Sequence, residues 1–547
     1  MRKLLLLIGF FSALSVQAQN ANETGRFWVY FSDKGHTPYS IQQPHAYLSD
    51  RSIERREKMH IPIRYSDLPV DPHYVVAVEA LGAEVVMQSR WFNALSVRVP
   101  DSSTLQAIQA LSFVQKVKPV MRYAFAPEVG EPFDNSLMRS SEVPGTEYGR
   151  SWNQIHMLNL DFLHEKGFRG EGMVIAVLDG GFYAVDTGEA FQSFWDKGQI
   201  LGVHNFPDDN EHVFDFSTHG ANVLSIMGGD IPGVFSGSAP DASFYLYRTE
   251  IVDSETVAEE DYWLEGAEMA DFVGADIINS SLGYTTFDGG IGDHTYADMD
   301  GNTTVVTNAA DMAAAVGILV CNSAGNEGDS EWHFIGAPAD GDSVFTIGAV
   351  DLNGHYAGFS SQGPTFDGRI KPNVAAQGAG TAYLEQSGLV YNGNGTSYSS
   401  PMMAGASACF WQAFPELSNM AVIEKIQESA SRASNPDYLI GYGIPDFTRA
   451  YLEMEGITIS GNTMQVYPNP ATDHCSVLIT GNDNADATLR LFDAAGKLVY
   501  IHTFRMEDEH LHLVEISGLN TMSSGLYFFS LQSENYTESL PLMVKWQ

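Results

Sequence analysis

Residues 173–181 read Met-Val-Ile-Ala-Val-Leu-Asp-Gly-Gly, a continuous apolar run that ends at Asp179. A short run without polar alternation is typical of a strand buried on both faces. Similar runs recur along the chain, at 200–203, 243–246, 276–279, 318–321 and 344–350. Helical patterns lie between them, for example at 219–227, 259–273 and 312–316. This alternation predicts an α/β domain with a parallel sheet flanked by helices.

In such folds, binding and catalytic residues lie at the carboxyl ends of the strands, and this chain has polar residues at those positions. Asp179 ends the first strand, and Asn326 follows another within Ser-Ala-Gly-Asn-Glu-Gly. Two further motifs are Ser-Thr-His-Gly, which contains His219, and Gly-Thr-Ser-Tyr-Ser-Ser-Pro, which contains Ser397. The order Asp, His, Ser is one of the chain orders of a hydrolytic triad.

The four residue types fit one reaction. A serine hydroxyl is a weak nucleophile until a histidine accepts its proton, and an aspartate fixes the tautomer of that histidine. An asparagine amide can donate to the oxyanion that forms. Taken singly, each residue also fits a plain structural role, such as a turn or a helix cap. Their order and motifs together favour a catalytic site made of Asp179, His219, Ser397 and Asn326.

The motif set resembles that of subtilisin-like serine peptidases over roughly residues 150–450. The resemblance implies that Asp179, His219 and Ser397 form the triad and that Asn326 belongs to the oxyanion hole. It also implies that Ser281-Leu282-Gly283 pairs with the substrate beside the primary specificity pocket. One departure is visible: the family often has His-Gly-Thr-His-Val around the base, whereas this chain has Phe-Ser-Thr-His-Gly.

The N-terminal part has a different character. Residues 1–18 have a basic start, an apolar stretch and a small residue before the expected cleavage point, as a signal peptide does. Residues 19–148 contain expected strands at 83–88, 94–99 and 114–119 and a helix at 102–111. This small α+β unit resembles the propeptide of subtilisin-like zymogens, with a generic accessory domain as the alternative. Its irregular end, residues 121–150, is the candidate linker for activation cleavage.

The C-terminal part opens with Val466-Tyr-Pro-Asn-Pro-Ala-Thr-Asp473 and continues with short alternating runs and tight turns. These runs, at 488–492, 498–504, 511–516, 525–531 and 542–544, predict a small β-sandwich. The segment resembles the C-terminal sorting domain of type IX secretion cargo, and a carbohydrate-binding sandwich is the alternative. The expected domains are therefore 1–18, 19–148, 149–455 for the peptidase, and 462–547.

Composition limits the partners of this 547-residue chain. It has 68 acidic and 29 basic residues, a formal net charge of −39, which argues against nucleic acid and anionic membranes as partners. Only three cysteines are present, so no disulfide framework is expected, and Cys321 and Cys409 fit buried free thiols. No apolar run of about twenty residues predicts an integral membrane segment. The expected location is secreted or on the cell surface.

No cofactor is required by this chemistry, and no zinc pattern is present. Many enzymes of the resembled family bind calcium, and Asp293, Asp298, Asp300 and Asn302 lie close in sequence, without the spacing of an EF-hand loop. The function expected is a secreted serine endopeptidase that cleaves protein or peptide substrates and is made as a zymogen. The alternatives are a non-catalytic surface binding protein on a peptidase-like fold, and an esterase that uses the same site.

Overall fold

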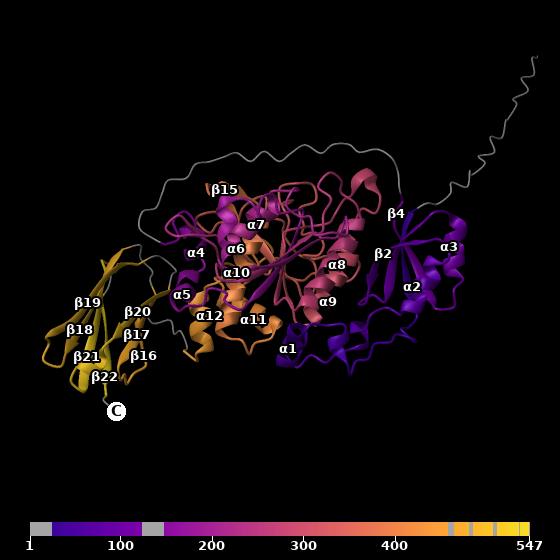
Figure 1. Cartoon of the computed structure of the whole chain (residues 1–547). Helices are drawn as coiled ribbons and strands as arrows, with labels where there is room; N and C mark the ends of the chain where they lie inside the picture. The colour runs from indigo at the N-terminus through magenta and orange to yellow at the C-terminus, as the bar shows by residue number, and fades with distance from the viewer. Residues whose placement is uncertain are drawn as a thin grey trace, which may run out of the picture.

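The computed structural model describes residues 25–122, 147–457, 464–480, 485–506, 511–534 and 537–545. The expected signal peptide at 1–18 and most of the expected linker, 123–146, lie outside the described residues. Figure 1 shows three folded units in a row, with the N-terminal unit at one end, the largest in the middle and a strand-rich unit at the other end. Among the described residues no helix is long and apolar enough to cross a membrane.

The central unit is built on a seven-stranded sheet in the order β13-β12-β11-β10-β5-β9-β6. All neighbouring strands in it are parallel, as the alternation of runs and helices predicts. The strands are β5 (Val174–Asp179), β6 (Ile200–Asn205), β9 (Ser243–Arg248), β10 (Ile277–Ser280), β11 (Leu319–Ser323), β12 (Phe345–Val350) and β13 (Val374–Gln377). The sequence analysis identified six of them and missed β13 at the edge.

Helices cover both faces of this sheet, as Figure 1 shows. They are α4 (Trp152–His156), α5 (Leu160–Glu165), α6 (Gln192–Asp196), α7 (His219–Gly228), α8 (Ala258–Val273), α9 (Val305–Ala315), α10 (Thr396–Ala413), α11 (Asn419–Ser429) and α12 (Phe447–Met454). Side chains of β5 alternate between the two layers: Ile175 and Val177 pack with α7 and α10, whereas Ala176 and Leu178 pack with α8 and α9. This double burial explains the uninterrupted apolar run.

Two short hairpins flank the central sheet. One pairs β7 (Asp230–Ile231) with β8 (Phe235–Ser236), and the other pairs β14 (Ala379–Leu384) with β15 (Val390–Asn394). The second hairpin leads directly into α10, the helix that carries Ser397. One predicted helix is longer than expected. The helix predicted at 312–316 is the last part of α9, which begins at Val305.

The N-terminal unit is a four-stranded sheet in the order β2-β3-β1-β4 with helices. Its elements are β1 (Gly25–Phe31), α1 (Asp50–Lys58), α2 (Pro72–Glu79), β2 (Glu84–Ser89), β3 (Ala94–Val99), α3 (Ser102–Gln109) and β4 (Val114–Arg122). The last four were predicted from the sequence, whereas α1, α2 and β1, which lies inside the sheet, were not. One side of the sheet faces the central unit, because Trp28 and Trp91 share an apolar cluster with α8 and α9 residues.

The C-terminal unit is a sandwich of two antiparallel sheets, as predicted. One has the order β16-β17-β20 and the other β19-β18-β21-β22. The strands are β16 (Met464–Tyr467), β17 (His474–Thr480), β18 (Asp486–Asp493), β19 (Leu498–Arg505), β20 (Leu511–Ser517), β21 (Gly525–Gln532) and β22 (Thr537–Val544). A core that includes Val477, Leu489 and Phe529 fills the space between the sheets.

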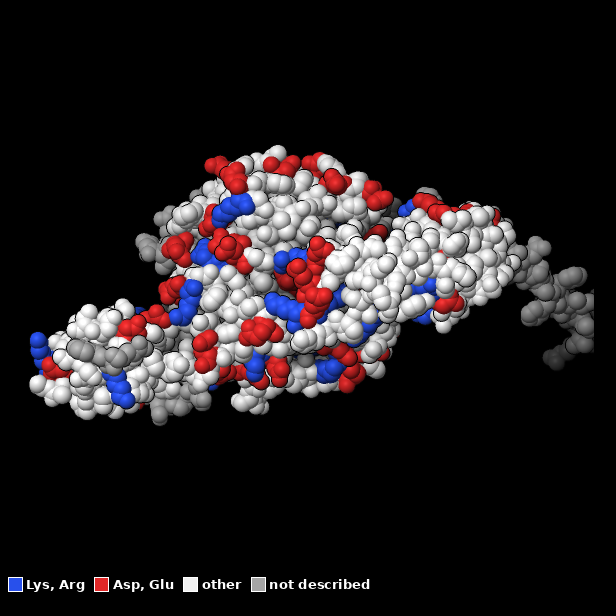
Figure 2. All heavy atoms as spheres, turned by 60° about the horizontal axis from the view of Figure 1, so that its bottom comes forward, with Lys and Arg blue, Asp and Glu red and all other residues white. Residues whose placement is uncertain are grey.

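The three cysteines are free and buried, one of them in the sandwich, which confirms the predicted buried thiols. Burial raises the pKa of the Cys321 thiol well above its ordinary value, so this residue is not a reactive thiolate. Figure 2 shows acidic side chains spread over the visible face of the molecule with basic ones among them, not gathered into one patch. This distribution fits a solvated acidic surface.

Candidate functional site

Asp179 and His219 meet at the carboxyl end of β5. Asp179 is the last residue of β5, with a side chain only 1% exposed, and His219 is the first residue of α7. The His219 Nδ1 atom lies 2.9 Å and 3.0 Å from the two carboxylate oxygens of Asp179. With a proton on Nδ1, the imidazole donates to Asp179 and its Nε2 is left as a proton acceptor.

The electrostatics of His219 follow from this contact. Burial lowers the pKa of His219, but the negative charge of Asp179 and its hydrogen bond raise it more, so the net pKa lies above the ordinary value. The side chain is still 33% exposed. A histidine that is both anchored by a carboxylate and open on one side can exchange a proton with a bound molecule.

Ser397 stands at the start of α10, where the backbone makes an unusual turn. Gly395, the residue before the helix, has a φ of 150°, a conformation that L side chains rarely adopt. The glycine of the motif is therefore required by the backbone. Ser397 is the second residue of α10, so the N–H groups and the positive end of the helix dipole lie around its hydroxyl.

The candidate nucleophile is held by the predicted substrate segment. The Ser397 hydroxyl donates to the Ser281 carbonyl oxygen at 3.3 Å, and the Ser281 hydroxyl donates to the Ser397 carbonyl oxygen at 3.1 Å. The Ser397 hydroxyl thus donates to Ser281 and not to His219. In enzymes without bound substrate, the hydrogen bond between a catalytic hydroxyl and its base is often long or poorly aligned. The residue after the nucleophile, Tyr398, has its ring centroid 6.4 Å from that of His219, so the starts of α7 and α10 adjoin.

A small cavity of about 90 Å³ lies against Ser397. The side-chain oxygen of Asn326 accepts the Thr396 N–H at 2.8 Å, which leaves its amide N–H groups available to another acceptor. The predicted site residues Ser281, Leu282, Gly283, Asn326 and Ser397 all contribute to one lining, which is completed by Thr285, Ser323, Ala324, Gly325, Glu327 and Gly336. The structure thus brings the predicted donor, nucleophile and substrate segment to one cavity.

From the sequence, the segment Arg248-Thr249-Glu250 is a candidate for a second wall of the substrate site, but the burial of its carboxyl group was not predicted. Glu250 follows β9, is nearly buried, and accepts a hydrogen bond from the Tyr284 hydroxyl. Burial raises its pKa to about 8. The signal in the sequence was weak, because Arg248-Thr249-Glu250 also fits an ordinary surface loop.

Among the described residues, one group of three acidic side chains could hold a metal ion: Glu250, Glu255 and Glu259, with carboxylate oxygens within 4.8 Å of one another. Asp293, Asp298 and Asp300 do not form such a group. Asp298 accepts from Thr295 and Asp300 from Asn302, bonds that are local to their turns. Calcium binding by this chain stays a prediction.

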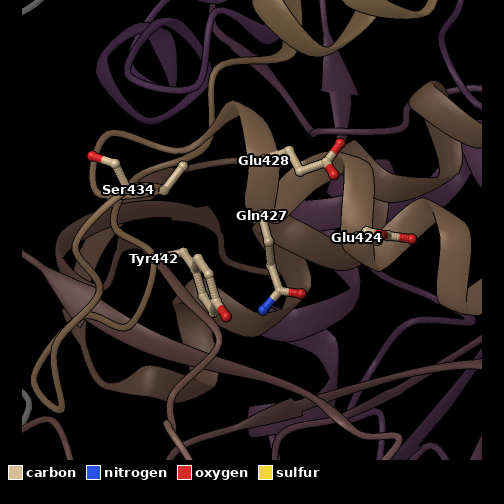
Figure 3. Close-up of a pocket in the computed structure, with 6 residues that line it drawn as sticks. Glu424, Gln427, Glu428, Ser434 and Tyr442 are labelled. Carbon is tan, nitrogen blue, oxygen red and sulfur yellow. The ribbon is translucent and has the colours of Figure 1, made fainter.

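A second cavity, of about 480 Å³, lies away from the triad residues between α11 and the loop that follows it. Figure 3 shows Glu424, Gln427 and Glu428 on one side of it and Ser434 and Tyr442 on the other. Its lining contains no histidine or cysteine, so it offers no nucleophile activated by a neighbouring base. Of these two cavities, only the smaller one is lined by the candidate nucleophile Ser397.

Comparisons with known proteins match three parts of the chain to known families. The profile of the subtilase family matches residues 170–443, that of the Peptidase S8 propeptide domain of Bacteroidota matches residues 26–130, and that of the secretion system C-terminal sorting domain matches residues 465–545.

Similar proteins include subtilisin DY of Bacillus licheniformis, 30% identical over 287 residues, which are 52% of this chain and 93% of that protein. Subtilisin E of Bacillus subtilis (strain 168) is 29% identical over 361 residues, 65% of this chain and 80% of that protein. Among solved structures, the MycP3 protease of the type VII (ESX-3) secretion system has a TM-score of 0.44 and 23% identity, covering 60% of this chain and 97% of that one.

Proposed function

Because this chain belongs to the subtilase family and is a serine endopeptidase with a propeptide and a secretion tail, we propose that it cleaves peptide bonds through Asp179, His219 and Ser397. The observation that carries the proposal is the His219 Nδ1 contact of 2.9 Å with Asp179, at a helix start that adjoins the start of α10. The proposed reaction passes through an acyl-enzyme on Ser397.

The proposed steps follow the positions of the protons. Nε2 of His219 accepts the Ser397 proton as the hydroxyl oxygen attacks the carbonyl carbon of the scissile bond. Asp179 stabilises the imidazolium that forms. His219 then protonates the leaving amine, the peptide C–N bond breaks, and the acyl group stays on Ser397. A water molecule, deprotonated by His219, then attacks the acyl carbonyl carbon. The ester bond to Ser397 breaks, His219 returns the proton to the Ser397 oxygen, and the second product leaves as a carboxylic acid.

Charge on the carbonyl oxygen requires donors in the transition state. We assign this role to the Asn326 amide and to the Ser397 backbone N–H at the start of α10. The support is that Thr396 fixes the side-chain oxygen of Asn326, so its amide nitrogen is the atom free to donate. Two fixed donors need no rearrangement as the negative charge develops.

The substrate would lie extended along Ser281-Leu282-Gly283. Pairing with the backbone of a strand edge gives affinity that does not depend on the substrate sequence, and a pocket then selects one side chain. The support is the shared lining of this segment and Ser397 around one cavity. The substrates are therefore proteins or extended peptides.

The sorting domain indicates export across the outer membrane to the cell surface or to the medium. We propose that the type IX secretion machinery is the partner that recognises it. The catalytic unit would then meet its substrates outside the cell, after the propeptide unit has been separated from it.

A fluorophosphonate probe with peptide mapping tests the catalytic proposal, because the probe labels only an activated serine. We expect label on Ser397 after removal of the N-terminal unit, weak label on the full chain, and none on Ser397→Ala. Unchanged peptide hydrolysis by Ser397→Ala would refute the assigned nucleophile. Absence of label on every form would favour the non-catalytic binding protein, and ester cleavage without amide cleavage would favour the esterase.

A further inference from the structure

Tyr398, the residue after the candidate nucleophile, is fixed from several sides. It is 5% exposed, and its ring stacks on Tyr383 with centroids 5.5 Å apart and planes at 2°. Gly393 lies directly against the ring, since a Cβ atom at that position would come within 2.5 Å of it. The hairpin β14–β15 therefore clamps the Tyr398 ring on the start of α10.

The same ring reaches the helix that carries the base. Its centroid lies 6.4 Å from that of His219 at an interplanar angle of 37°, within the range of aromatic contacts. The side-chain amide of Asn222, three residues after His219 on α7, lies close enough to the Tyr398 hydroxyl to lower the pKa of that phenol. One side chain thus joins the helix of Ser397 to the helix of His219.

We propose that Tyr398 is a positioning residue, which together with Asn222 sets the orientation of the His219 imidazole relative to Ser397. The proposal rests on the triad proposed above. Asp179 holds His219 only at Nδ1, so that contact alone leaves the ring free to tilt about it. The Tyr398 ring limits this tilt, and its proximity to both His219 and Asn222 ties the start of α10 to α7. It takes no part in proton transfer, because burial raises the pKa of its phenol to about 12.

The competing explanation is that Tyr398 only fills the core, where it belongs to the same apolar cluster as Met402 and Tyr383. Loss of a core side chain lowers stability and the fraction of folded molecules. It does not change the rate of each folded molecule or the proton affinity of the base. Rates expressed per titrated active site therefore separate the two explanations.

The experiment uses the mature enzyme, titrated with a fluorophosphonate so that only competent sites are counted. Tyr398→Phe keeps the ring and removes the hydroxyl that lies near Asn222, so we expect kcat to fall about threefold to tenfold, with KM within about twofold. Tyr398→Leu removes the ring, and we expect a loss of about a hundredfold in kcat. Its acid limb of kcat/KM should move to lower pH, because a looser contact with Asp179 lowers the pKa of His219.

Two further variants complete the test. Asn222→Ala should match Tyr398→Phe, and the double variant should lose little more, since both remove the same polar contact. Tyr391→Phe is the matched control, a hydroxyl removed from another tyrosine that packs against Tyr383, and should leave kcat unchanged. If Tyr398→Leu does not fold, the phenylalanine and alanine variants carry the test.

A kcat per titrated site within about threefold of the parent in Tyr398→Leu, with an unchanged pH profile, would overturn the positioning role. So would additive losses in the double variant. A parent enzyme that takes no label at Ser397 would instead refute the proposed triad, and the two failures are therefore distinct.

Discussion

Replacement of Asp271 by asparagine should release the N-terminal unit from the catalytic unit. Asp271 lies on α8 with a side chain 0% exposed, and three arginines of the N-terminal unit surround it. Arg55 donates to one carboxylate oxygen, Arg56 to both at 2.8 Å, and Arg90 to the second at 2.7 Å. Asparagine keeps the shape but removes the charge that these guanidinium groups share.

The magnitude follows from the burial of this cluster. Burial raises the pKa of Asp271, but the three arginines lower it far more, so the carboxylate is ionised at neutral pH. Removing one partner of a buried ion pair costs about 3–5 kcal/mol, because the remaining charge stays buried without compensation. Docking of the N-terminal unit should therefore weaken by roughly two to three and a half orders of magnitude.

Hydrogen exchange of two backbone amides measures this docking. The Arg90 and Trp91 N–H groups donate to the Glu268 carboxylate across the interface, at 3.1 Å and 3.2 Å, so their protection depends on the docked state. The full chain would carry Ser397→Ala to prevent self-cleavage. We expect exchange of these amides to accelerate by at least about a hundredfold in Asp271→Asn.

The control variant lies in the same interface. Asp276→Asn removes a charge whose partner Arg51 is 41% exposed, and exposed pairs contribute about 0–1 kcal/mol, so exchange should change by less than about fivefold. Asparagine can still accept the Val174 N–H that Asp276 accepts at 2.9 Å. Equal effects of the two variants would refute the reasoning that burial decides the strength of these contacts.

Two further predictions concern the site. Asn326→Ala should lower kcat about a hundred- to a thousandfold without loss of folding, the effect measured for one oxyanion donor in subtilisin itself and carried over here; steady-state kinetics and thermal unfolding check it. The acid limb of kcat/KM should lie above pH 6.5, because the base must be neutral and Asp179 raises the pKa of His219. In Asp179→Asn the limb should move to lower pH and kcat should fall about ten-thousandfold; an unmoved limb would contradict the assigned pair.

Strands and turns that depend only on residues close together in the sequence were predicted from local patterns. The run at 173–178 predicted β5 because burial on both faces excludes polar side chains from it. Gly395 belongs to the Ser397 motif, and its φ of 150° shows why the backbone requires glycine at that position. Alternation and turn residues likewise predicted β18 to β22 of the sandwich, whereas β16 and β17 were not predicted.

Contacts between distant segments were not predictable in this way. Asp50–Lys58 has the composition of a solvated helix, yet Arg55 and Arg56 are buried because α8, more than 200 residues later, supplies Asp271. Tyr398 stood among small residues in the motif, and nothing local indicated that its ring would lie between Tyr383 and His219. Such pairings depend on how two helices dock, which no single segment encodes.

The proline of the Ser397 motif shows how separate motifs act as one unit. Pro401 has no N–H, so the helical bond to the carbonyl four residues earlier, that of Ser397, cannot form. The Ser281 hydroxyl donates to this oxygen instead, while the Ser281 carbonyl accepts from the nucleophile. The Ser397 carbonyl oxygen is therefore left without that helical bond and accepts the hydrogen bond from the Ser281 hydroxyl. It follows that Ser281, a residue assigned to substrate binding, also holds the nucleophile, and that this contact joins two motifs more than a hundred residues apart in the sequence.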